Sequence, residues 1–246
     1  MEQKEMINKV IQWDCLEVMK HIEDKSVDMI LCDLPYGTTA CKRDTIIPFE
    51  PLWEQYTRII KDNGAIVLTA SQPFTSALVM SNPRMFRYSL VWDKIKWTWF
   101  LNARKMPMRN HEDILVFYKK LHIYNPQKTT GHNRKVSFRG KHLQTDVYWE
   151  MKNDYKYDST DRFPRSIQSF YTDTQNSSLH PTQKPVALFE YLIKTYTNEW
   201  DLVLDNCAGS FTTAIASMNL KRNWICIEKE AEYCEIGRKR IEENNK

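Results

Sequence analysis

The chain has 246 residues, of which 42% are hydrophobic, a composition that suits one large folded domain and excludes a disordered tail. Its 35 Lys and Arg residues nearly balance 31 Asp and Glu residues, so the net charge is only +4. No run of eighteen apolar residues marks a membrane span, and the polar start "MEQKEMINKV" has no apolar signal core. We therefore expect a cytoplasmic protein that does not act at a membrane.

Helix-like and strand-like patterns alternate along the first part of the chain. Apolar residues at helical spacing predict helices over residues 15–22, 49–64 and 73–82. Short apolar runs predict strands over residues 27–34, 65–70, 88–94 and 113–119. Gly64 is expected to end the second helix. Such alternation is typical of an α/β fold in which a mostly parallel sheet carries helices on both faces.

Residues 119–178 differ from the rest of the chain. They hold 11 Lys and Arg against 6 Asp and Glu, whereas residues 1–118 hold 15 of each kind. The periodicity fades here and aromatic residues lie among the basic ones, which predicts a loop-rich insert. Basic residues among aromatics suit a polyanion with stackable bases, but a solvated surface insert has the same composition. Composition alone leaves both interpretations open.

Regular patterns return after the insert. They predict a helix over 184–197, a strand and turn over 201–210, a helix over 211–220, a strand over 223–230 and a closing helix over 231–245. We therefore divide the chain into 1–118, 119–178 and 179–246, with the first and last parts forming one domain. The six cysteines form no CxxC pair, and we expect reduced core thiols and no metal site.

The segment "LVLDNCAGSFTTAIA" has the pattern of a strand, a tight turn and a helix. Its strand ends at Asp205, and the next strand ends at Glu228, where an acid is placed to accept hydrogen bonds from ribose hydroxyls. No G-x-G-x-x-G motif is present, so a ligand with adenosine and no phosphates fits better than a dinucleotide. The alternative is an ordinary strand-helix-strand unit in which Asp205 caps the helix.

Three motifs together resemble one family. "DLPYG" (33–37) is similar to the D-P-P-Y catalytic motif of amino-group methyltransferases, while "HPTQKP" (180–185) and "DNCAGSFTT" (205–213) are similar to its other two signatures. Their order resembles the permuted β group of DNA methyltransferases that modify N6 of adenine or N4 of cytosine. The resemblance covers almost the whole chain. It implies a Rossmann-like fold that binds S-adenosylmethionine, with residues 119–178 as an inserted target-recognition region.

The resemblance also implies roles for single residues. The implied catalytic motif is Asp33, Leu34, Pro35 and Tyr36. The implied cofactor-binding residues are Asp14, Cys15, Asp33, Lys184, Asp205, Asn206, Cys207, Ala208, Gly209, Ser210, Phe211, Thr212 and Glu228. Among them, Glu228 would hold the ribose hydroxyls, Lys184 would approach the methionine carboxylate and Asp14 would lie near the adenine ring. No metal is implied.

Chemistry supports the catalytic role of "DLPY". The exocyclic amine of adenine is a poor nucleophile because its lone pair is delocalised into the ring. The Asp33 carboxylate and the Leu34 carbonyl are adjacent acceptors that would localise this lone pair, and Tyr36 would stack on the base. We expect positioning and electrostatics to supply most of the acceleration, on a base that is flipped out or met single-stranded.

Within the insert, several polar residues are candidates for contacting DNA. Cations there would neutralise phosphates, which makes binding sensitive to salt, and amide or guanidinium groups would read base edges. The residues we select are Asn133, Arg134, Lys135, Arg139, Lys141 and Gln144.

The chain departs from the family pattern at three positions. The family usually has proline at the position of Leu34 and at that of Asn206, and a second glycine at the position of Phe211. The change at Leu34 is expected to be mild because the backbone carbonyl carries the function. The ring of Phe211 would either narrow the cofactor pocket or pack beneath the loop.

Four functions compete at this point. Asp33 in the first motif position favours N6 of adenine, because N4-cytosine enzymes more often carry serine there. An RNA or protein methyltransferase fits the permuted order and the basic insert less well. A DNA-binding protein with a decayed site is the alternative from another class, supported by Leu34 and Phe211. Expected partners are DNA, a second copy in a homodimer and a separately encoded restriction endonuclease.

Overall fold

An eight-stranded mixed sheet organises the larger part of the chain in the computed structural model, which describes residues 2–38, 44–98, 103–140, 153–172 and 183–245. The strand order is β1 (Lys9–Gln12), β10 (Asn223–Glu228), β9 (Leu202–Asp205), β2 (Val27–Cys32), β3 (Ile60–Ala70), β5 (Arg109–Phe117), β4 (Phe86–Thr98) and β8 (Ile167–Ser169). Neighbours from β1 to β3 pair in parallel, whereas β5 runs antiparallel to both β3 and β4. The mostly parallel sheet of the predicted α/β fold is confirmed.

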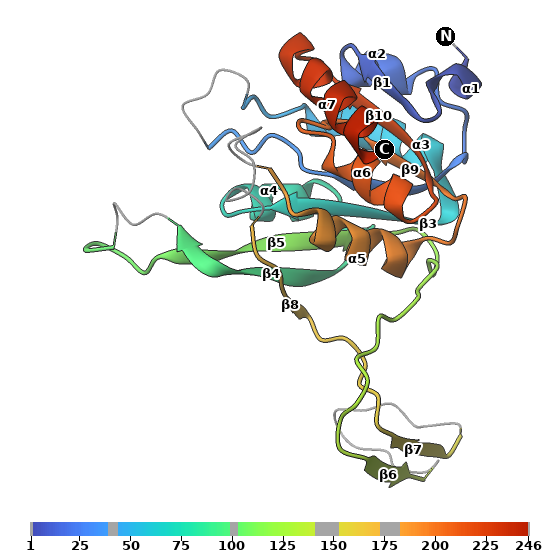
Figure 1. Cartoon of the computed structure of the whole chain (residues 1–246), viewed down its shortest axis with the longest axis vertical. Helices are drawn as coiled ribbons and strands as arrows, with labels where there is room; N and C mark the ends of the chain where they lie inside the picture. Colours follow the sequence, from blue (N-terminus) through green and yellow to red (C-terminus); the bar gives the residue numbers. More distant parts are fainter. Residues whose placement is uncertain (1, 39–43, 99–102, 141–152, 173–182, 246) are drawn as a thin grey trace. The chain divides into compact units, whose positions relative to one another are not determined.

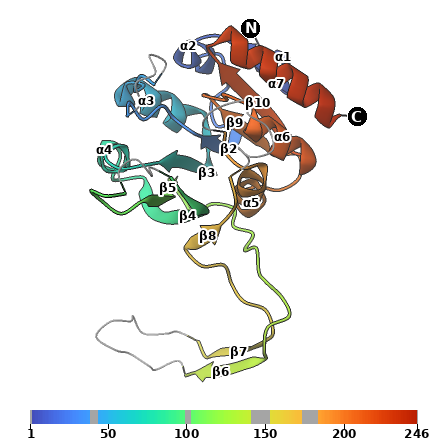
Figure 2. The same cartoon turned by 60° about the vertical axis from the view of Figure 1, so that its left-hand side comes forward.

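Helices cover both faces of this sheet (Figures 1 and 2). One face carries α1 (Gln3–Met6), α2 (Cys15–Met19), α3 (Phe49–Ile59) and α4 (Phe74–Ser81), whose apolar residues share a core cluster. The other face carries α5 (Val186–Tyr196), α6 (Thr212–Asn219) and α7 (Ala231–Asn244). Helix α7 contacts β1 and β10, while α5 packs beside α6.

Central strands are buried on both faces, which explains their predominantly apolar sequences. In β2 all six residues are buried. Met29 and Leu31 face the core beneath α5, while Ile30 and Cys32 face the core beneath α2 and α3. The strand period of two therefore assigns alternate residues to opposite cores.

The predicted helix over 49–64 is wrong at its end. Helix α3 ends at Ile59, and β3 begins at Ile60 without an intervening loop. Gly64 lies inside β3, where a Cβ atom would lie 2.7 Å from the backbone oxygen of Asp28. The glycine is thus needed for the close approach of β2 and β3, not to end a helix.

The chain divides into two compact units. The first consists of the residues up to Asn125 and those from Ser166 onwards, and the second is Pro126–Arg165. The second unit holds the antiparallel pair of β6 (Lys135–Arg139) and β7 (Tyr155–Ser159), with Thr129 bridging to Arg162. A strand pair thus occupies part of the insert that we predicted as loop-rich. Among the described residues, no helix combines the length and apolar character needed to cross a bilayer.

Candidate active site

Sheet topology brings the expected site residues to one edge. Asp33 directly follows β2, Asp205 ends β9 and Glu228 ends β10. These three strands run parallel, so their carboxyl ends lie at the same edge. Because β5 runs antiparallel to β3, pairing Asp113 with Ala70, the amino end of β5 also lies at this edge.

Three donors hold one oxygen of the Asp33 carboxylate. The Tyr36 hydroxyl donates to Oδ1 at 2.7 Å, and the Thr69 hydroxyl donates to the same atom. The Lys184 ammonium lies 2.9 Å from Oδ1 as well. Among the described residues, none donates a hydrogen bond to Oδ2. The carboxylate is therefore anchored through one oxygen and keeps the other as an acceptor.

Lys184 also contacts a second carboxylate, that of Glu112 in β5. Its Nζ lies 2.9 Å from Glu112 Oε2, and Lys94 in β4 lies 2.6 Å from Glu112 Oε1. Burial by itself raises the pKa of Glu112, but the two ammonium groups outweigh it and lower the pKa of this carboxyl. Burial lowers the pKa of Lys184, but Asp33 and Glu112 together raise it above its ordinary value. Two cations and two anions thus form a balanced buried cluster.

Two further side chains of the "DLPY" motif, those of Tyr36 and Leu34, are also held in place. The Tyr36 ring stacks on Phe74 of α4, with centroids 5.2 Å apart and planes 23° from parallel. Burial raises the pKa of Tyr36, which keeps its hydroxyl a hydrogen-bond donor. The Leu34 side chain is buried in the core beneath α2 and α3. A leucine in place of the family's proline therefore contributes to packing.

The loop after β9 is held from three sides. The Asp205 carboxylate accepts hydrogen bonds from the Thr213 hydroxyl at 2.5 Å and from the Cys207 backbone N–H at 3.1 Å. Burial raises the pKa of Asp205 to about 7. The Tyr56 hydroxyl of α3 donates to Asn206 at 2.5 Å, and the Gly209 N–H donates to Glu228 at 2.8 Å.

The bulky ring of Phe211 packs beneath this loop. Phe211 has a left-handed backbone with φ of 61°, a conformation that favours glycine. Its ring is fully buried in a cluster with Trp224, Cys226 and Cys234. Gly237 of α7 lies directly against it, and a Cβ at that position would come within 2.6 Å of the ring atom Cε2.

Thiols gather near the start of the loop. The Cys207 thiol interacts with those of Cys15 and Cys32. The interaction with Cys207 lowers the pKa of Cys15, whereas burial raises the pKa of Cys32 to about 12. These cysteines are free thiols. Nearby, Asp14 caps α2 by accepting a hydrogen bond from the Leu16 N–H at 3.0 Å.

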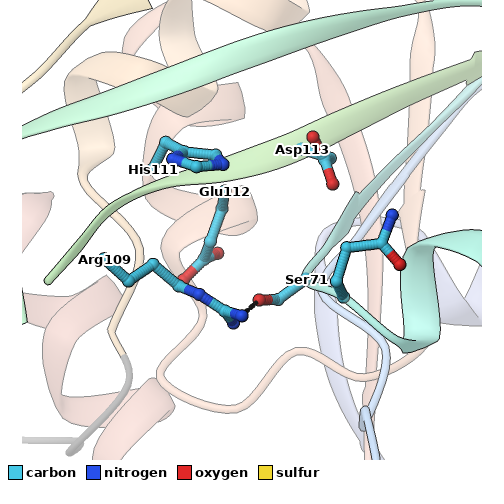
Figure 3. A pocket seen from close by; sticks show the side chains of 6 residues that line it. Ser71, Arg109, His111, Glu112 and Asp113 are labelled. Carbon is cyan, nitrogen blue, oxygen red and sulfur yellow. Dashed lines mark hydrogen bonds between the residues drawn. The ribbon is translucent and has the colours of Figure 1, made fainter. Parts of the chain in front are cut away.

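A small hollow borders the charged cluster at the start of β5 (Figure 3). Its lining residues are Ser71, Gln72, Arg109, His111, Glu112 and Asp113. The Arg109 guanidinium donates to the Ser71 hydroxyl across it. Glu112 therefore belongs both to the cluster and to the wall of an opening beside it.

The six residues selected for DNA contact all fall within the range of the second unit, and the structure describes four of them. Arg134 forms a two-pronged ion pair with Asp158, at 2.7 Å and 2.5 Å, and the Asn133 carbonyl accepts a hydrogen bond from Arg162. Lys135 and Arg139 lie on one face of the strand pair. Lys141 and Gln144 lie outside the described residues, as does the "HPT" part (180–182) of the second signature.

Sequence reasoning missed Thr69, Lys94 and Glu112. Thr69 ends the run "AIVLT" as an unremarkable strand residue, and "HEDILVF" gives no local sign that its glutamate is functional. Their roles depend on the register of β5 against β3 and β4, where Glu112 lies opposite Trp92. The structure supplies the signal that the sequence lacks: the charged side chains of Lys94 and Glu112 lie in strands and are only 12% exposed.

The residues at this edge fit an adenosyl cofactor. The Asp205 and Glu228 carboxylates flank a loop whose backbone turns at Gly209, with φ of 50°. Beside Lys184, the side-chain oxygen of Gln183 is buried and has no hydrogen-bond partner in the part of the chain that is described. A buried acceptor without a donor is expected where a ligand completes the site.

Comparisons with known proteins agree with this geometry. The chain is 26% identical to the type II methyltransferase M.HpaI of Haemophilus parainfluenzae, covering 96% of this chain and 75% of that protein. It is 28% identical to the DNA adenine methyltransferase YhdJ of Escherichia coli, covering 95% and 82%. The fold matches a crystal structure of an M1.HpyAVI–SAM complex with a TM-score of 0.64 and 24% identity, covering 95% and 98%. A family model described as DNA methylase matches residues 27–239. The chain belongs to this DNA methylase family and is an S-adenosylmethionine-dependent DNA methyltransferase.

Proposed function

We propose that this enzyme transfers a methyl group from S-adenosylmethionine to the N6 amine of adenine in DNA. The observation that carries the proposal is the Asp33 carboxylate, anchored through Oδ1 and open at Oδ2 beside the loop that follows β9. The name of the relative YhdJ, a DNA adenine methyltransferase, supports adenine as the base.

Asp33 would act by accepting a hydrogen bond. An N–H of the target amine donates to Oδ2, and the second N–H donates to the Leu34 carbonyl, which localises the nitrogen lone pair. As the nitrogen would form its bond to the methyl carbon, the bond from that carbon to sulfur would break, and the nitrogen would gain positive charge, which the adjacent carboxylate stabilises until one N–H proton passes to water. The bound cofactor supplies an electrophilic methyl group on sulfur. Asp205, Glu228 and the loop between them are the residues that would hold it.

Two alternatives make different predictions. N4-cytosine methylation would use the same acceptors, so only the product distinguishes it. A decayed site receives no support from Phe211 or Leu34, since both side chains pack in the core. An intact cluster of Asp33, Tyr36 and Lys184 favours an active enzyme.

Mass spectrometry of treated DNA tests the proposed base. Unmethylated DNA is incubated with the enzyme and S-adenosylmethionine labelled in its methyl group, then digested to nucleosides. Labelled N6-methyladenine is the expected product, and a reaction without enzyme is the control. Labelled N4-methylcytosine with no N6-methyladenine would overturn the choice of base.

Cofactor affinity is expected to depend on pH through Asp205. Burial raises the pKa of this carboxyl to about 7, so it is largely protonated at pH 6 and ionised at pH 8. S-adenosylmethionine carries a cationic sulfur, and an ionised carboxylate nearby attracts it. We expect tighter binding at pH 8 than at pH 6 in calorimetry. S-adenosylhomocysteine, which lacks this charge, should show a smaller change.

Asp205→Asn is the matched variant for this pH dependence. It keeps the acceptor oxygen for the Thr213 hydroxyl but does not titrate. The difference in affinity between pH 6 and pH 8 should then disappear. An undiminished difference in this variant would show that another group titrates.

One face of the β6–β7 pair suits DNA. Register places Lys135, Ser137 and Arg139 opposite Ser159, Tyr157 and Tyr155 on a single face. The other face carries Val136 and Phe138 with Asp158 and Lys156. A two-stranded ribbon fits the major groove of DNA. The basic and tyrosine-bearing face is therefore the one that we propose contacts DNA.

Salt dependence tests this assignment. Removing a phosphate-contacting cation lowers the slope of log affinity against log salt by about 1. We expect this for Lys135→Ala and for Arg139→Ala in fluorescence-anisotropy titrations with duplex DNA. Lys156→Ala on the opposite face is the matched control and should keep the slope. Equal effects from both faces would contradict the proposed orientation.

The proposal also includes partner proteins. A separately encoded restriction endonuclease is supported by the type II names of the relatives M.HpaI of Haemophilus parainfluenzae and M2.MboI of Moraxella bovis. We also propose a cytoplasmic location, because the relatives are bacterial DNA methyltransferases and DNA would be their substrate there. The homodimer implied by the family resemblance stays a prediction.

A further inference from the structure

We propose that Glu112 and Lys94 are positioning residues for methyl transfer: they hold the Lys184 ammonium on Oδ1 of Asp33, so that Oδ2 stays turned to the target amine. This inference rests on the proposed function, because it names the residues that support the Asp33 carboxylate, the proposed acceptor of a hydrogen bond from the target amine. It gives Lys184 a role toward the carboxylate of Asp33 in place of the methionine carboxylate of the cofactor.

A continuous series of ion pairs carries the inference. Lys94 contacts Glu112 at 2.6 Å, Glu112 contacts Lys184 at 2.9 Å and Lys184 contacts Asp33 at 2.9 Å. The members come from β4, β5, the segment before α5 and the segment after β2. The side chain of Lys184 is only 8% exposed and those of Lys94 and Glu112 12%, so water screens these contacts weakly.

The alternation of charge explains why Glu112 is needed. A buried ammonium paired with Asp33 alone would concentrate its charge on the acceptor carboxylate and weaken it as an acceptor. Glu112 shares that ammonium, and Lys94 in turn balances Glu112. The cluster is then neutral in total, while Asp33 keeps its negative charge.

The hydrogen-bond pattern separates the two oxygens of Asp33. All three donors, from Tyr36, Thr69 and Lys184, contact Oδ1 of Asp33. This fixes the orientation of the carboxylate about its bond to Cβ. The oxygen that would accept the amine is thereby held in place before the substrate arrives, which lowers the cost of organising the transition state.

The position of the Asp33 carboxylate therefore depends on its charged neighbours. The groups that face it are the titratable or charged side chains of Tyr36, Lys184, Glu112, Asp205 and Cys32. Lys184 is the only cation among these described groups. Removing its charge would leave the carboxylates of Asp33 and Glu112 to repel each other.

Removal of charge in a pair of variants tests the proposal. In Lys184→Met the single-turnover rate should fall about 10²-fold, because the acceptor carboxylate is no longer held in place. Adding Glu112→Gln removes the repulsion between the two carboxylates and should restore part of the rate. Lys184→Arg keeps the cation and is the matched control, with a rate well above that of Lys184→Met. S-adenosylmethionine affinity should stay within about threefold in all three variants.

Two outcomes would overturn the proposal. One is an unchanged transfer rate in Lys184→Met, which would mean that the ammonium does not hold the acceptor. The other is a lost rate that Glu112→Gln does not restore, combined with a cofactor affinity about tenfold weaker, which would assign Lys184 to the methionine carboxylate. If Lys184→Met does not fold, Glu112→Gln alone serves: its rate should fall while its cofactor affinity stays the same. An unchanged rate in that variant would overturn the proposal.

A spectroscopic readout separates this inference from the proposed function. Carboxyl-labelled aspartate allows the surroundings of the Asp33 carboxyl to be followed by ¹³C NMR, with Asp33→Asn identifying its signal. A changed chemical shift of this carbon is expected in Lys184→Met and in Glu112→Gln without any methyl transfer. Absence of methylated adenine together with the expected NMR shifts would refute the proposed base and keep the cluster assignment.

Discussion

Asp33→Ala is expected to lower the single-turnover rate of methyl transfer about 10³-fold, which is the size of the loss when one preorganised partner of the reacting atoms is removed. Cofactor affinity should change little, since Asp33 contacts Tyr36, Thr69 and Lys184 in the structure. The fold should persist because Lys184 retains Glu112 as a partner. Rapid-quench transfer assays and calorimetry with S-adenosylmethionine measure the two quantities.

Two variants accompany this experiment. Asp33→Asn keeps a carbonyl acceptor without the charge, so its rate should lie between those of the wild type and Asp33→Ala. Asp24→Ala removes a carboxylate that is 72% exposed and paired with Arg58, and transfer should be unaffected. Normal turnover in Asp33→Ala would refute the catalytic role of this residue.

Gly237→Ala is expected to destabilise the fold by about 2–3 kcal/mol, the cost of overpacking a closely packed core. In a helix interior this change usually stabilises by about 1 kcal/mol. Here the new methyl group would overlap the Phe211 ring, coming within 2.6 Å of Cε2. Thermal and urea unfolding followed by circular dichroism measure the change.

In a Phe211→Ala background, the effect of Gly237→Ala on stability should change sign. Phe211→Ala alone removes a buried ring and should cost about 3–5 kcal/mol. Once the ring is gone, adding Gly237→Ala should stabilise the helix instead. Gly140→Ala, where an added Cβ meets no described atom within 4 Å, is the control and should have little effect. If Gly237→Ala destabilises both the wild type and Phe211→Ala, the ring does not press on Gly237.

Local patterns predicted the part of the site that follows from strand ends. The strands that deliver Asp33 and Asp205 are continuous apolar runs, and parallel pairing brings their carboxyl ends together. Glu112 and Lys94 could not be found in this way, because their approach depends on antiparallel register between distant segments. Register is a property of the assembled sheet and leaves little trace in one strand's sequence.

Two further differences have the same origin. The end of α3 was misjudged because Ile60 continues the helical spacing, yet the pairing of Val27 with Ile60 makes it a strand residue. The β6–β7 pair was missed although "KVSFR" alternates polar and apolar residues, because a run of five residues that are all exposed differs little from a loop. The place of the Phe211 ring depended on Gly237, which is remote in sequence.

The separateness of residues 126–165 as a compact unit has an evolutionary consequence. The Asp33 cluster and the loop after β9 belong wholly to the other unit, so mutations in the β6–β7 pair replace none of their residues. With the proposed DNA contact on this pair, substitutions there can change the target sequence while the catalytic residues stay the same. New target sequences would then arise through substitution of one contiguous stretch of the gene.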